Sequence, residues 1–150
     1  MPATDRVMKW LAWLPALYAA QTMLWYEQFK LTGAEGSVML FSILADWLWI
    51  GGYEKPFRLS VAIVELVASV LLINTGSRMY GALLTLGIMS GAIFFHVVSP
   101  LGIDPYNDGG QLFMEACWTW LAAVAILAIY RRELAAVVGS VVGRPPRLAF

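Results

Sequence analysis

Residues 77–132, SRMYGALLTLGIMSGAIFFHVVSPLGIDPYNDGGQLFMEACWTWLAAVAILAIYRR, decide the fold. They contain two apolar runs of about 20 residues, each long enough as a helix to cross a hydrocarbon layer about 30 Å thick. A turn rich in Gly, Pro and Asp separates the runs. The stretch predicts a transmembrane helical hairpin, with His96 just before the turn and Glu115 just after it, close to one membrane surface.

The composition of the whole chain also indicates a bilayer. Of its 150 residues, 60% are hydrophobic and 13% are charged, so the chain has more apolar surface than a soluble domain of this size could bury. A net charge of zero and the absence of a basic patch argue against a nucleic-acid partner. The single cysteine, Cys117, excludes an internal disulfide, and the sequence shows no metal-ligand pattern.

Two further spans are expected on the N-terminal side. Residues 9–29 form the first, which is too long and too rich in Trp for a cleaved signal peptide, and Pro15 should kink it. Residues 57–74 form the second, with Glu65 near its centre. The short apolar run at 37–50 favours an interfacial or re-entrant helix over a full span. The expected fold is an all-α membrane four-helix bundle over residues 1–133, followed by a cytoplasmic tail over 134–150.

The basic residues predict an orientation, because loops on the cytoplasmic side carry an excess of Lys and Arg. With four spans, one side holds most of the basic residues and the other side holds three. We therefore expect both termini on the cytoplasmic side of a bacterial inner membrane. The two groups are Arg6, Lys9, Arg78, Arg131, Arg132, Arg144 and Arg147 on the cytoplasmic side, and Lys30, Lys55 and Arg58 on the outer side.

Polar side chains from all four expected spans fall in the outer half of the bundle. A carboxyl group at the depth of Glu65 is costly unless it faces the interior, where it can be paired, protonated or close to water. Gln21, His96 and Glu115 lie in the same half, which predicts one polar-lined cavity. Structural alternatives remain open: a packing hydrogen bond for Glu65, a satisfied structural histidine for His96 and a helix cap for Glu115.

No established catalytic motif is present, and one histidine cannot provide bis-imidazole haem ligation. Three roles for the polar side chains remain open: proton handling, binding of a quinone head group, or a purely structural polar core. A quinone would find hydrogen-bond donors in His96 and Gln21 and ring contacts in Trp25 and Phe95. The GxxxG spacing of Gly87 and Gly91 predicts close helix packing.

The order of these elements resembles the DoxX-like family of small four-helix membrane proteins. It comprises a first helix ending in Lys30, the segment FRLSVAIVELVASVLLI with its central Glu65, the Gly-rich segment LLTLGIMSGAIFFHVVSP with His96, and a fourth helix after an Asp/Asn/Gly turn. The resemblance covers residues 10–133 and implies a membrane subunit associated with oxidoreductases, the thiosulfate:quinone type among them. It emphasises Lys30, Glu65 and His96. Glu27 and Gln28 depart from the family pattern, in which small residues are usual.

Two function classes follow. In the first, the chain is the membrane subunit of a redox system and binds a quinone or a reduced-sulfur species. No intrinsic cofactor is expected, so a protein partner would have to carry the electrons of the redox reaction. The chain could also form a homo-oligomer. In the second, the chain is a non-catalytic membrane anchor or assembly partner. The residues assigned to the first class are Glu65, His96 and Glu115 for proton transfer, and Gln21, Trp25, Lys30 and Phe95 for binding.

Overall fold

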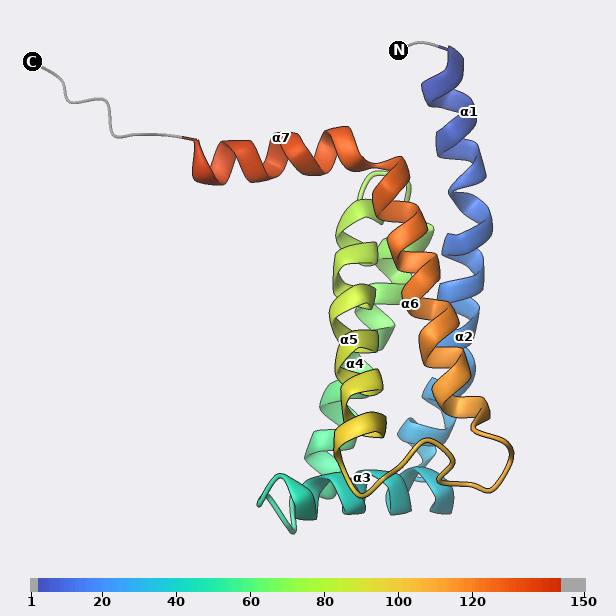
Figure 1. The fold of residues 1–150 in the computed structure, drawn as a ribbon, viewed down its shortest axis with the longest axis vertical. Helices are drawn as coiled ribbons and strands as arrows, with labels where there is room; N and C mark the ends of the chain where they lie inside the picture. The colour runs from blue at the N-terminus through green and yellow to red at the C-terminus, as the bar shows by residue number, and fades with distance from the viewer. Residues whose placement is uncertain (1–2, 144–150) are drawn as a thin grey trace, which may run out of the picture.

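A computed structural model describes residues 3–143, and within that range every regular element is an α-helix (Figure 1). The all-α prediction is therefore confirmed. The helices are α1 (Ala3–Leu11), α2 (Trp13–Thr32), α3 (Glu35–Trp47), α4 (Glu54–Ile73), α5 (Arg78–Val98), α6 (Gln111–Ile129) and α7 (Arg131–Val142).

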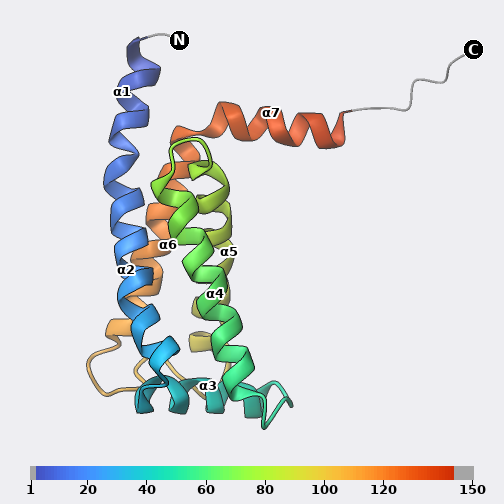
Figure 2. The same cartoon turned by 180° about the vertical axis from the view of Figure 1, so that it is seen from behind.

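Four long helices run side by side and form the body of the molecule. α2 packs against α4, α4 against α5, α5 against α6, and α6 against α2, so each helix has two main neighbours (Figure 2). Three of the four, α4, α5 and α6, are long and apolar enough to cross a membrane. The length and hydropathy of these three helices are those expected of an integral membrane protein.

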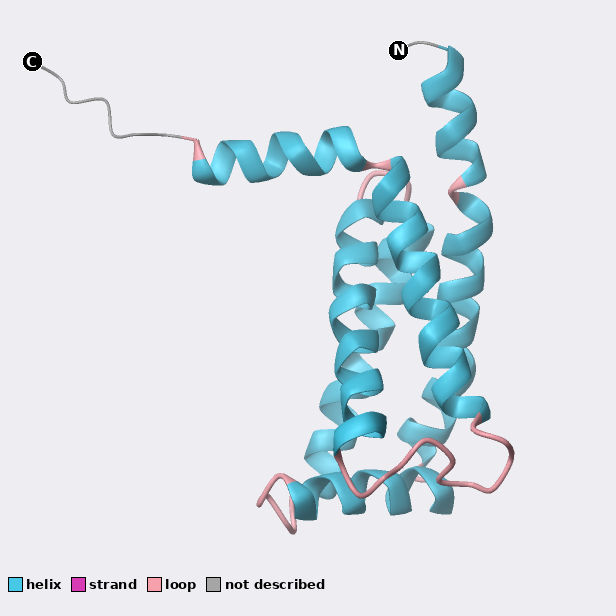
Figure 3. Cartoon of the chain, viewed as in Figure 1, coloured by secondary structure: helices cyan, strands magenta, loops and turns pink. Residues whose placement is uncertain are grey.

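The first expected span is divided into two helices. The helix is interrupted at Ala12, between α1 and α2, which otherwise follow one another along nearly the same line (Figure 3). Pro15 explains the interruption, because it has no N–H to donate and its ring crowds the carbonyl of the residue four positions earlier, Leu11. The predicted disturbance by Pro15 is present, and helical structure extends beyond residues 9–29 at both ends.

The short helix expected at 37–50 is α3, which lies across one end of the four long helices (Figures 1 and 2). Gly33 allows this change of direction, because it ends α2 with a φ of 71°, in the left-handed region that glycine favours. Leu40, Phe41 and Leu44 on α3 are buried in an apolar cluster with Leu101 of the α5–α6 connection. α3 therefore covers this end of the molecule.

The α4–α5 hairpin is tightly packed at the opposite end. A Cβ atom on Gly81 would lie 2.6 Å from the backbone nitrogen of Leu72, so glycine is required for this close approach. Arg78 is fully buried there, with its Nε donating to the Leu72 carbonyl at 2.8 Å and its guanidinium 3.9 Å from the Trp13 ring centroid. The sequence counted Arg78 only as a basic residue on the cytoplasmic side; the structure shows that it is buried and that it donates to the main chain at the end of α4.

The segment after α6 is helical. α7 leaves the other helices at a large angle, at the end from which α1 also projects (Figure 1). An ion pair between Lys9 and Glu133 connects α1 with α7. The predicted tail at 134–150 is thus a helix as far as Val142, and its residues 144–150 lie outside the described part of the chain.

Candidate functional site

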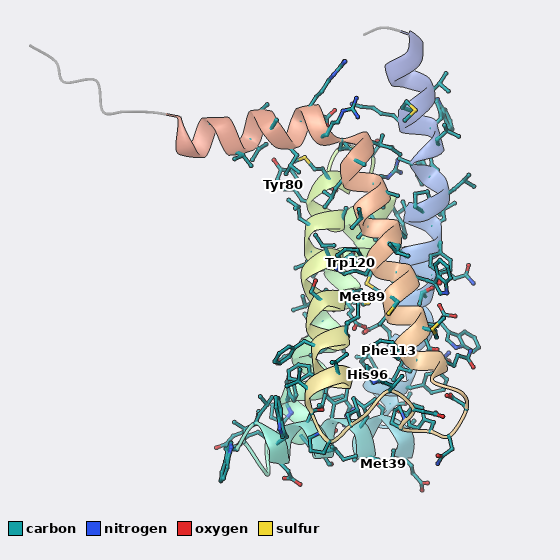
Figure 4. All side chains as sticks on the ribbon, in the orientation of Figure 1. Met39, Tyr80, Met89, His96, Phe113 and Trp120 are labelled. Carbon is teal, nitrogen blue, oxygen red and sulfur yellow. The ribbon has the colours of Figure 1, made fainter. Side chains whose placement is uncertain are left out.

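A cavity of about 590 Å³ lies among the long helices, with α3 at one end. Most of the residues that line it are apolar, and all four long helices and α3 contribute. Figure 4 shows Met89 and then His96 following one another down the molecule toward Met39 on α3. The charged and titratable side chains on the wall are Tyr26, Lys30, Glu65, His96, Tyr106 and Glu115.

Lys30 joins two buried carboxyl groups beside this cavity. Its Nζ pairs with Glu65 Oε2 and lies 3.5 Å from Glu27 Oε1. Glu65 is 5% exposed and Glu27 is 3% exposed, and within the described chain Glu27 Oε2 has no hydrogen-bond partner. One ammonium cannot neutralise two buried carboxylates, and an uncompensated buried charge is costly. The cluster of Glu27, Lys30 and Glu65 (the Lys30 cluster) is therefore electrically balanced when it retains one proton.

Arg58 fixes the position of Lys30. It is buried, its Nε donates to Glu54 Oε1 at 2.5 Å, and its Nη1 donates to the main-chain carbonyl of Lys30. That carbonyl lies in the last turn of α2, where no further helical N–H is available to satisfy it. The sequence counted Arg58 only as a basic residue on the outer side; the structure shows that it joins α4 to the end of α2.

Two predicted binding residues do not line the cavity. Gln21 and Trp25 lie on one face of α2, as expected, but this face points outward, and Trp25 is 61% exposed. The inward face instead carries Ala16, Ala20, Met23 and Glu27. The interior position of Glu27 is not predicted from the sequence. The row of small residues preceding it marks the face that packs against α4 and α6.

His96 is held in a defined orientation. It is 4% exposed, its Nδ1 lies 2.7 Å from the Gly102 carbonyl oxygen, and the Phe113 ring packs edge-on at 5.7 Å between centroids. Since a carbonyl oxygen only accepts, Nδ1 carries the hydrogen, and Nε2 of the neutral imidazole is an acceptor. No described residue bonds to Nε2. With its ring hydrogen on Nδ1, the uncharged imidazole offers the cavity an acceptor at Nε2, whereas the sequence predicts a donor to a quinone carbonyl.

Glu115 borders the cavity at the contact between α2 and α6. Its Oε2 accepts a hydrogen bond from the Tyr18 hydroxyl at 2.7 Å. The alternative role as a helix cap is already filled, because Asp108 Oδ1 accepts from the main-chain N–H groups of Gly110 and Gln111 at 3.1 and 3.0 Å. The Glu115 carboxyl group is thus not used as a helix cap, and it forms part of the cavity wall.

The α5–α6 connection is fastened over this end by Tyr106. Its hydroxyl donates to the Gly36 carbonyl at the start of α3, with 2.9 Å between the oxygens. Burial, with the nearby Asp108 as a second cause, raises the pKa of Tyr106 above its ordinary value, so the hydroxyl stays protonated and can donate. Tyr106 therefore connects the loop to α3 beside the cavity.

The predicted close packing at Gly87 and Gly91 is wrong. A Cβ atom built on either residue would meet nothing within 4 Å, and both glycines line the cavity. The close approach of α5 to α4 is made at Gly81 instead. Phe95 also lines the cavity, with Trp47 of α3 packed edge-on against it at 6.0 Å between centroids. The predicted site residues on the wall are Lys30, Glu65, Phe95, His96 and Glu115.

Comparison with known proteins identifies no relative: no family model, no curated protein and no solved structure matches the chain. Among residues 3–143, no group of three or more His, Cys, Asp or Glu side chains is placed to hold a metal ion.

Proposed function

We propose that α2 crosses the membrane together with α4, α5 and α6, giving a four-span bundle of the DoxX-like type. α2 has 20 residues, or about 30 Å at helical rise, and its outward face exposes Leu14, Leu17 and Leu24 to the surroundings. Its two charged cavity-side residues, Glu27 and Lys30, are paired, which lowers their cost in an apolar medium.

In this proposal both chain ends face the cytoplasm of a bacterial cell and α3 lies at the outer surface of the inner membrane. The support is the distribution of charge: Arg131 and Arg132 lie at the end from which α1 and α7 project. The basic residues at the α3 end are fewer, and Lys30 and Arg58 among them are engaged with carboxylates.

We further propose that the cavity binds a lipophilic molecule with a hydroxyl-bearing ring, for which a quinol is the best fit. The observation that carries this proposal is an apolar cavity of ligand size with the Nε2 atom of His96 unpartnered on its wall. A quinol hydroxyl donates to Nε2, and the same atom can accept the proton. An oxidised quinone only accepts, so it would bond to Nε2 only when the imidazole is protonated.

A reduced-sulfur anion fits this wall less well. The acidic and basic side chains that line the cavity are Lys30, Glu65 and Glu115, so carboxyl groups outnumber ammonium groups. A further negative charge would meet net repulsion at low dielectric. The proposed role is therefore that of a membrane subunit of an oxidoreductase system, with Glu65 and Glu115 on the same cavity wall as the proton-accepting His96, and with redox centres in a partner protein.

One feature favours the second candidate function, a non-catalytic anchor. Trp49, in the turn between α3 and α4, is 94% exposed, and Tyr53 in the same turn is 66% exposed. Exposed aromatic residues of this kind are common both at protein interfaces and at membrane surfaces. In this alternative the turn docks a partner protein and the cavity has no ligand.

Photolabelling with an azido-benzoquinol in reconstituted vesicles tests the proposal. We expect label in the peptide that contains Phe95 and His96, and we expect His96→Ala to reduce labelling about tenfold, the effect of one lost hydrogen bond to a buried group. Trp25→Ala, on the outward face, is the control and should label like the parent. Label confined to the Trp25 peptide, or unaffected by His96→Ala, would exclude the cavity as the site.

A further inference from the structure

α4 and α5 are in close contact near their connecting turn, and part of α5 further along borders open space. Near their connecting turn, a Cβ atom on Gly81 would lie 2.6 Å from the backbone of Leu72. Two and three turns further along α5, at Gly87 and Gly91, a Cβ atom would meet nothing within 4 Å. No neighbouring helix is therefore packed against the Cα positions of Gly87 and Gly91, and the two glycines add no side chains that would fill the space beside them.

The residues that border this space belong both to the cavity wall and to the outer surface. Gly87 is exposed and Gly91 is half-buried, while Ser60 and Val64 on α4 are exposed, and all four line the cavity. We call the gap bordered by Ser60, Val64, Gly87 and Gly91 the α4–α5 opening. A residue that is exposed and also lines the cavity lies where the cavity reaches the surface.

The depth of the α4–α5 opening decides what it faces. Gly87 is nine residues beyond Arg78, the start of α5, or about 14 Å along a helix of 21 residues. In a helix that crosses the membrane, this position lies near the middle of the hydrocarbon layer. The opening therefore faces acyl chains, whereas Phe29 and Tyr106, which also line the cavity and are exposed, lie at the α3 end near the membrane surface.

We infer that the cavity receives its ligand from the hydrocarbon layer through the α4–α5 opening, and that the bound ligand leaves an apolar tail in it. This inference rests on the proposed function. Its independent support is His96, which is nine-tenths buried, lines the same cavity and has an unpartnered Nε2. Along α5, His96 lies five residues from Gly91 and nine from Gly87, or about 8 to 14 Å. A molecule that binds Nε2 and also fills the opening is therefore longer than a single ring.

Two benzoquinols with the same head group test this inference: one with a decyl tail and one without a tail. Their affinities are measured by equilibrium binding to the full chain in nanodiscs, for the parent and for Gly87→Leu and Gly91→Leu. We expect each substitution to weaken binding of the decyl probe about tenfold or more and to leave binding of the tail-less probe unchanged, because the new side chain occupies the space of the tail. Gly139→Leu in α7 is the matched control, since Gly139 also has open space but lies away from the cavity.

Val64→Trp closes the same opening from α4 and replaces an already exposed side chain, so it provides the test if a glycine variant fails to fold. Equal binding of the decyl probe by the parent and by folded closing variants would overturn the inference. Equal loss of both probes would also overturn it, because the substitutions would then act on the head group. A parent that binds neither probe contradicts the proposed function itself.

Discussion

Replacing Lys30 by Met should lower the free energy of unfolding by about 3 to 5 kcal/mol, the usual cost of removing one partner from a buried ion pair. The reason is that Glu27 and Glu65 would remain buried without the ammonium group that both contact. The loss should shrink as the pH is lowered, because protonation removes the remaining unpaired negative charge. Thermal unfolding in detergent micelles at several pH values measures this effect.

Two variants separate this mechanism from a general loss of packing. Adding Glu65→Gln to Lys30→Met removes one of the two carboxyl groups left without the ammonium group and should restore about 2 kcal/mol or more. Lys55→Met, at an exposed lysine near the same end, should change the stability by less than about 0.5 kcal/mol. A double variant as unstable as Lys30→Met alone would show that the lysine stabilises the bundle by its packing.

Alanine should have opposite effects at two glycines of α5. Gly81→Ala should cost about 1 to 3 kcal/mol or more, because its Cβ would lie 2.6 Å from the Leu72 nitrogen and 2.8 Å from the Leu71 carbonyl carbon, both backbone atoms. Gly87→Ala should add about 0.5 to 1 kcal/mol, since it meets open space and alanine is the better helix former.

The sign of each change is the informative result. A chain of this length changes its Tm by roughly 2 to 4 °C per kcal/mol, so the two variants should differ by several degrees in one unfolding experiment. Stabilisation by Gly81→Ala together with destabilisation by Gly87→Ala would contradict the close contact at Gly81 and the open space at Gly87. It would instead support the GxxxG packing expected from the sequence.

Most of the helix positions could be predicted from the sequence, because length and hydropathy limit what a membrane-crossing segment can be. The disturbance by Pro15 and the short helix α3 followed from the same local chemistry. The inward face of α2 could not be predicted in this way, because a helix that crosses a membrane is apolar on its lipid-facing side as well as on its inward side. Polar side chains such as Gln21 therefore suggested the wrong face, and the small residues Ala16 and Ala20 marked the correct one.

Other features depend on contacts between distant segments. The GxxxG spacing of Gly87 and Gly91 is compatible with either close packing or a gap, and the crossing point at Gly81 decides between them. The hydrogen-bonding role of His96 depends on the Gly102 carbonyl in the following loop, which sequence spacing could not place. The burial of Arg78 likewise depends on Trp13, far away in the chain.

The central claim is that His96 contacts a bound ligand inside the cavity, and the chain contains one histidine, so a single imidazole reports on it. Nitrogen-15 NMR of histidine-labelled protein in nanodiscs follows this imidazole while a decyl-benzoquinol is added. We predict a neutral ring protonated at Nδ1, and an Nε2 signal that shifts as the hydroxyl donates to it and stops shifting at one ligand per chain. An Nε2 signal that does not move under saturating ligand, or a ring protonated at Nε2 before any ligand is added, would contradict the account.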